Sequence, residues 1–239
     1  MKIQQRFLLA PFAFLFLLTA CKKEEAADPV DLGYDYFPTK VGSWIEYQVD
    51  SMWRDDPLGI WDSVSYPLLE RIHENYTDPE GRPSQRVLRY VRDVQDNWVV
   101  RDVWTRTLTT AAAEMTEENK RRLKLSFPVR NARTWDINVY NTDDDLTVAF
   151  REVDQPLQLG NLAFESTVLV KNTVPPNFID KRNFEERYAR GVGMVSKYWE
   201  ETNTQTIYPP PTPPDPDPDP IISVKGWRLN MVAVAYGND

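Results

Sequence analysis

The chain has 239 residues, with 28 Lys and Arg against 36 Asp and Glu, and a formal net charge of −8. This acidic excess argues against nucleic acid or an anionic lipid surface as the main partner. With one histidine and one cysteine, a zinc or copper site of the usual type is nearly excluded, and stability has to come from packing rather than disulfides.

The first 20 residues have the organisation of a secretory signal peptide. Lys2 and Arg6 form a basic start, and an apolar run of 14 residues extends from Phe7 to Ala20. That run is shorter than the about 20 residues a membrane-spanning helix needs. We predict that residues 1–20 are removed.

The sequence Leu18-Thr19-Ala20-Cys21 resembles a bacterial lipobox. The resemblance implies cleavage before Cys21 and attachment of acyl chains to its sulfur, which would anchor the protein to a membrane. An ordinary signal peptide followed by a chance cysteine is the alternative.

The residues after Cys21 bear on location. Lys22 replaces the aspartate that marks inner-membrane retention in many Gram-negative lipoproteins, and "CKKEE" resembles the export signal of surface lipoproteins in the Bacteroidota. A plain solvated tether would have the same composition. We expect a lipid-anchored outer-membrane protein, with the cell surface slightly favoured over the periplasmic face.

Residues 21–33 are predicted to be a flexible lipidated tether, and 34–239 a single β-rich domain. Alternation begins in "SWIEYQVDS", where Ile45, Tyr47 and Val49 share one face. A turn is expected at 78–81, because Pro and Gly occupy the positions that turn chemistry favours.

One helix of two to three turns is expected within residues 109–123, "TTAAAEMTEENKRRL", because strong helix formers follow the candidate cap Thr110, with Thr116 as a second choice. Alternation then resumes and continues to "GWRLNMVAVAYG". About ten strands with one helix predict a single strongly curved antiparallel sheet, or an open or half barrel.

The proline-rich stretch 208–222 cannot lie inside a sheet, since proline has no amide donor. We expect an extended arm between the last two strands, either an insertion at a hairpin tip or a docking segment.

Four stretches together resemble a group of outer-membrane lipoproteins of the Bacteroidota: "YFPTKVGSWIEYQVDS", "KLSFPVRNARTWDINVYN", "ERYARGVGMVSKYWEE" and "GWRLNMVAVAYGND". The resemblance spans most of the chain after the predicted signal peptide and implies no particular chemistry. Gly191 and Gly193 suit a tight turn. Trp44, Trp135 and Trp227 are interpreted as core or rim aromatics rather than ligand platforms.

No catalytic, cofactor or metal residues are predicted. His73 lies in a polar alternating strand without a nucleophile-elbow pattern, which indicates a surface or half-buried histidine. The acidic stretches "NTDDD" (141–145) and "DPDPDP" (215–220) indicate solvated turns, with an oxygen-ligand calcium site as the alternative.

The sequence predicts a non-catalytic binding or carrier module for an apolar ligand or lipid, because the last strand has apolar side chains on both faces: Trp227, Leu229 and Met231 on one, and Val232, Val234 and Tyr236 on the other. The alternatives are an interaction subunit of an outer-membrane protein assembly and a surface carbohydrate-binding protein. An enclosed apolar cavity would favour the carrier.

Overall fold

The computed structural model describes residues 29–211, 217 and 219–239, and places Asp31–Asp239 in one compact unit. The predicted signal peptide, Cys21 and most of the predicted tether lie outside the described residues. The first residues of the unit already make contacts, because the Val129 amide donates to the Leu32 carbonyl oxygen at 3.1 Å.

Nearly all regular structure in this unit is strand. The twelve strands are β1 (Ser43–Asp55), β2 (Ile60–Thr77), β3 (Pro83–Arg92), β4 (Trp98–Leu108), β5 (Ala112–Glu117), β6 (Lys120–Ser126), β7 (Thr134–Asp136), β8 (Thr147–Leu159), β9 (Leu162–Asn172), β10 (Asp180–Ala189), β11 (Gly193–Ile207) and β12 (Ile221–Asn238). In the described ranges, the helices are two short 3-10 turns, η1 (Tyr34–Tyr36) and η2 (Asp56–Leu58).

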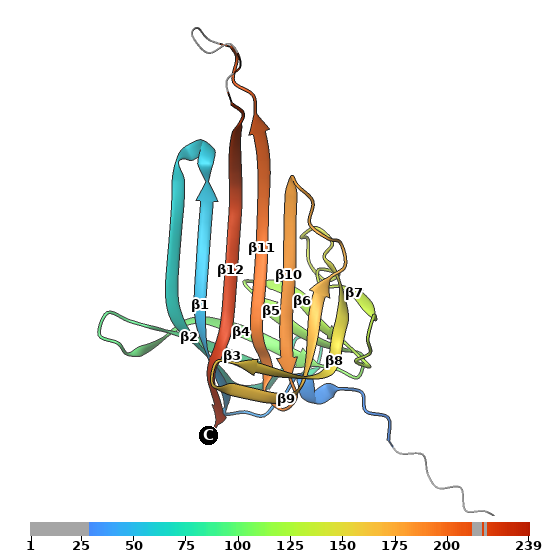
Figure 1. Ribbon diagram of the computed structural model, residues 1–239. Helices are drawn as coiled ribbons and strands as arrows, with labels where there is room; N and C mark the ends of the chain where they lie inside the picture. Colours follow the sequence, from blue (N-terminus) through green and yellow to red (C-terminus); the bar gives the residue numbers. More distant parts are fainter. Residues whose placement is uncertain (1–28, 212–216, 218) are drawn as a thin grey trace, which may run out of the picture. The chain divides into compact units, whose positions relative to one another are not determined.

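All twelve strands belong to one antiparallel sheet, in the order β6-β5-β4-β3-β2-β1-β12-β11-β10-β9-β8-β7. The first and last strands are neighbours in its middle, and β6 and β7 are its edges. These edges approach each other, since the Leu123 amide donates to the Ile137 carbonyl oxygen at 2.9 Å. The sheet is a nearly closed barrel (Figure 1), which confirms the predicted fold class.

Four long strands rise beyond the barrel as a ribbon: β1, β2, β11 and β12 (Figure 1). Pairing continues to Asp55 opposite Ile60 and to Ile207 opposite Ile221. The proline-rich segment therefore connects the ends of a hairpin, as expected of an insertion at a tip. Ile221 and Ile222, at the end of the predicted arm, belong to β12.

The predicted helix at 109–123 is wrong. The segment contains β5 and the start of β6, which are joined by Glu118 and Asn119 with φ of 48° and 61°. Positive φ at both central residues is typical of the two-residue turn that matches strand twist. Ala113 and Met115 are buried in the sheet, so tertiary pairing overrides helix propensity.

Other local predictions are confirmed. Tyr47 and Val49 are each 1% exposed, as their alternation predicts. The turn at 78–81 joins β2 to β3, and the Gly81 amide donates to the Asp78 carbonyl oxygen at 2.9 Å. Gly191, between β10 and β11, and Gly193, the first residue of β11, both have positive φ.

The main core lies between η1 and the half of the barrel that contains β5 to β10. It includes Phe150, Phe184 and Tyr188, each no more than 1% exposed. Tyr36 of η1 is fully buried in this cluster, and its hydroxyl donates to Asp154 at 2.8 Å. The short helix therefore packs firmly against the interior of the barrel.

Candidate functional site

The barrel contains a cavity of about 310 Å³. Its size falls at the lower end of the range for small-molecule sites. The cavity is lined from strands on both sides of the central β1–β12 pair and from Phe37, which directly follows η1. The predicted curvature of the sheet therefore does create an internal space.

One wall of the cavity is aromatic and apolar. The Trp199 and Trp227 rings lie 5.3 Å apart, and Phe184 meets Trp199 edge-on at 5.2 Å. Trp227 also pairs with Trp53 across the β1–β12 ladder. Leu229 and Met231 continue this wall. Such a surface suits the hydrocarbon part of a ligand.

A buried ionic cluster adjoins this wall, since the Lys197 ammonium lies 5.1 Å from the centre of the Trp199 ring. The Lys124 ammonium lies 2.5 Å from Glu186 and 3.0 Å from Glu117. Lys197 lies 3.1 Å from Glu186, and the Tyr188 hydroxyl donates to Glu186 at 2.6 Å. Two cations and two carboxylates thus face each other in a space almost closed to solvent.

A β-bulge brings Lys124 into this cluster. Ala113 and Glu114 of β5 pair with Leu125 and Leu123 of β6, so Lys124 is the extra, unpaired residue. A bulge redirects side chains relative to regular alternation. This explains why a lysine between two leucines is 2% exposed.

The mutual attraction of these groups holds them charged. Burial opposes the charge of Glu117, but Lys124, Lys197 and Arg122 outweigh it and lower its pKa to about 2. In Lys124, the loss of hydration lowers the pKa, but the attraction of Glu117 and Glu186 outweighs it and the net shift is upward. Glu117 and Lys124 are therefore charged near neutral pH.

A second ionic group is centred on Arg89. Its guanidinium binds Glu70 at 2.9 Å and Asp102 at 3.1 Å, and it stacks over the Trp104 ring at 3.5 Å. Arg101 shares Asp102 at 2.7 Å. The charges in this group are balanced by their neighbours.

Arg106 of β4 also lines the cavity, and it is 9% exposed. Its guanidinium carbon lies 3.7 Å from the centre of the Phe37 ring. In the part of the chain that the structure describes, Arg106 has no ion pair, and its Nε has no hydrogen-bond partner. Desolvation lowers the pKa of Arg106 to about 10, so the group remains positively charged at neutral pH.

The tryptophans singled out in the sequence lie either in the core or in the cavity lining. Trp135 is 8% exposed and belongs to the core, whereas Trp44 and Trp227 are half-buried and line the cavity. Trp135 thus fits the interpretation as a core aromatic, and the half-buried Trp44 and Trp227 also contribute to the cavity lining. His73 is exposed on β2, as expected, and Cys21 lies outside the described residues.

Sequence reasoning missed the buried charged residues. The sequence gives little sign of their burial, because each lies in a strand, where charged side chains normally point to solvent. The β5–β6 pair and the β10–β11 pair lie in opposite halves of the sheet, and only its closure into a barrel brings Glu117, Lys124, Glu186 and Lys197 together.

The acidic stretch 141–145 forms ion pairs. Asp143 binds Lys120 at 2.5 Å and Arg122 at 3.0 Å. In residues 29–211, 217 and 219–239, no three His, Cys, Asp or Glu side chains are grouped so that they could hold a metal ion. The same residues include no helix of the length and apolarity needed to cross a membrane.

Comparisons with known protein families, with curated proteins and with solved structures each found no match to this chain.

Proposed function

We propose that this protein is a lipid-anchored, non-catalytic binding or carrier module that holds an apolar or amphipathic small molecule inside its barrel. The observation that carries the proposal is the cavity of about 310 Å³ with its wall of Trp199, Trp227 and Leu229. Apolar walls with a few oriented polar groups are typical of ligand pockets.

Binding of decanol tests this proposal directly. The full chain is prepared as the Cys21→Ala variant, so that no attached acyl chain contributes, and is titrated with decanol below its solubility limit. Tryptophan fluorescence reports entry, because Trp104, Trp199 and Trp227 line the cavity. Saturable binding with one site is expected, and its absence would refute the proposal.

A blocking variant locates the site. Met115 lines the cavity and is 9% exposed, so Met115→Trp should fill part of the space and weaken decanol binding. Val100→Trp on neighbouring β4 is the matched control, since Val100 is 50% exposed and lies outside the lining. Equal affinities in the two variants would place binding elsewhere.

The anchor and location form part of the same proposal. Cys21 is the acylated residue, and the protein resides in the outer membrane, with the cell surface favoured. Labelled palmitate should enter the wild-type product and not the Cys21→Ala product. Digestion by protease added to intact cells distinguishes the outer from the inner face. Equal labelling of both products would overturn the assigned anchor.

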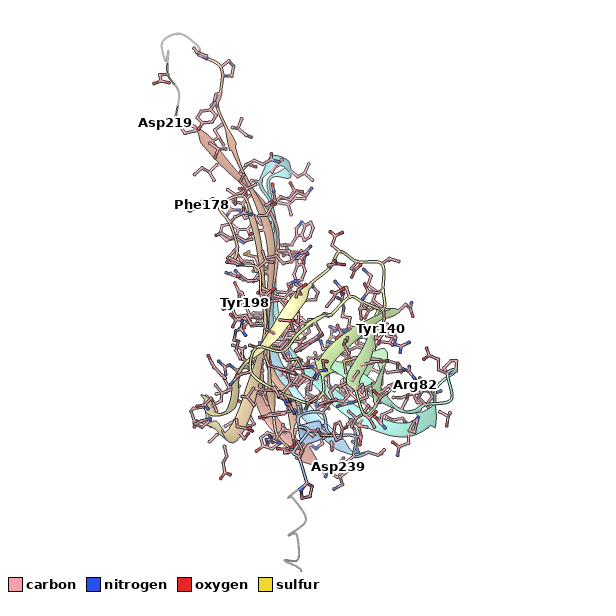
Figure 2. All side chains as sticks on the ribbon, turned by 90° about the vertical axis from the view of Figure 1, so that its right-hand side faces the viewer. Arg82, Tyr140, Phe178, Tyr198, Asp219 and Asp239 are labelled. Carbon is pink, nitrogen blue, oxygen red and sulfur yellow. The ribbon has the colours of Figure 1, made fainter. Side chains whose placement is uncertain are left out.

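A second candidate function, an interaction with another outer-membrane protein, is supported by exposed apolar side chains near the ends of the long hairpins and in the loop between β9 and β10. Trp61 is 75% exposed, Tyr208 78% and Phe178 98%. Figure 2 shows Phe178 and Asp219 toward one end of the folded unit and Asp239 at the other. A photo-crosslinking residue at position 61 should capture one repeated protein partner. Specific hits of the Cys21→Ala protein on a glycan array would instead favour surface carbohydrate.

A further inference from the structure

The cavity is lined by one buried cation, Arg106, that forms no ion pair among the residues that the structure describes. Five cationic and three acidic side chains line it. Arg89 and Arg101 are paired with Glu70 and Asp102, and the two lysines face Glu117 and Glu186. The third lining carboxylate, Glu118, is exposed in the β5–β6 turn and accepts a hydrogen bond from Trp104. Arg106 remains as the lining cation that forms no ion pair within the described residues.

Desolvation lowers the pKa of Arg106 and the attraction of Glu70 opposes this shift, but Glu70 is itself bound to Arg89 at 2.9 Å and forms no ion pair with Arg106. Its closest described partner is the face of the Phe37 ring at 3.7 Å. Gln85 stands opposite Arg106 in the β3–β4 ladder, and the side-chain oxygen of Gln85 also has no partner among the described residues. Even a bond between the two would leave a full positive charge, because an amide is neutral.

A buried charge without a partner is expensive for the folded protein, and such groups are normally paired. A guanidinium presents parallel N–H groups that match the two oxygens of a carboxylate. We propose that the ligand of the cavity is a long-chain monocarboxylate whose head group binds Arg106. This inference rests on the proposed binding function and specifies the chemistry of its ligand.

The cavity also provides a path for the chain of such a ligand. Arg106 interacts electrostatically with Tyr47, near the start of β1. Trp53 lies six residues further along the same strand, which corresponds to about 20 Å at the rise of a β-strand. Trp53 is 45% exposed and pairs with Trp227. The cavity lining thus includes both Arg106 and Trp227, and Trp53, the partner of Trp227 in the ladder, reaches solvent.

Three ligands with the same ten-carbon chain test the proposal: decanoate, decanol and decylammonium, titrated into the full-length Cys21→Ala protein. Decanoate should bind about 10- to 100-fold more tightly than decanol, the range expected for hydrogen bonds to a charged group. Decylammonium should bind most weakly. Decyl phosphate is included to separate a carboxylate site from a phosphate site.

Two variants assign the effect to one residue. Arg106→Met should abolish the advantage of decanoate and leave decanol binding within about twofold, whereas Arg106→Lys should retain part of the advantage. Arg86→Met is the matched control, because Arg86 is exposed on β3 and paired with Glu74.

The outcomes separate the two proposals. If none of the ligands binds, the binding function itself fails. If decanol binds to the protein with Arg106 intact and decanoate binds no more tightly than decanol, only the carboxylate proposal fails. This comparison does not depend on whether the Arg106 variants fold. A preference for decyl phosphate over decanoate would also overturn it.

Discussion

Replacing Lys124 by methionine removes one cation from the buried cluster while keeping the length of the side chain. Lys124 is 2% exposed and contacts Glu117 and Glu186 at 3.0 and 2.5 Å. In its absence Lys197 still lies 3.1 Å from Glu186, while Arg122 and Lys197 lie 3.7 and 3.9 Å from Glu117. Removing one partner of a buried ion pair costs about 3–5 kcal/mol, a large share of the stability of an ordinary domain.

The free energy of unfolding of the Cys21→Ala protein and of its Lys124→Met derivative is measured in urea by tryptophan fluorescence. Lys171→Met is the matched control, because its pair with Glu185 is exposed and should contribute at most about 1 kcal/mol. Adding Glu186→Gln to Lys124→Met restores the charge balance and should recover part of the loss. If Lys124→Met costs no more than Lys171→Met, the cluster does not hold the barrel together.

Three further predictions concern acid, a glycine and the proline segment. Because the folded-state pKa of Glu117 is about 2, below its ordinary value of 4.5, this group stabilises the fold above pH 4.5 by about 3 kcal/mol. This contribution to the free energy of unfolding, measured by urea titration, should be lost as the pH falls from 4.5 to 2. In a Glu117→Gln variant the free energy of unfolding should not show this part of the pH dependence. Gly226→Ala should lower the melting temperature by more than about 2 °C, because its Cβ would lie 2.0 Å from the Glu201 carbonyl oxygen. Gly160→Ala, where a Cβ meets no atom within 4 Å, should lower the melting temperature by less. A larger loss in Gly160→Ala than in Gly226→Ala would contradict the steric argument. Replacing residues 209–219 with Asn-Gly preserves the β11–β12 register. The melting temperature should stay within about 2 °C of the value before the replacement, and a fall of 5 °C or more would mean that the segment stabilises the fold.

The sequence was sufficient to predict the class of the fold, because alternation such as that of Tyr47 and Val49 depends only on neighbouring residues. It failed at 109–123, where alanines with high helix propensity are buried in paired strands. It also could not predict the cavity charges, since Lys124 enters through a bulge and its partner Glu186 is 62 residues away. Arg106 is recognisable as unusual only when the absence of a partner can be observed.

The pairing of β1 with β12 has a consequence for the order of folding. Strands β1 to β6 and strands β7 to β12 each form a meander of neighbouring hairpins, but Ser43 has its partner at Asn238. The two meanders can therefore join through the ladder between them only once the final strand has been synthesised. Contacts so distant in the chain form slowly, so we expect the hairpins of each meander to pair before the β1–β12 ladder joins the two halves of the sheet.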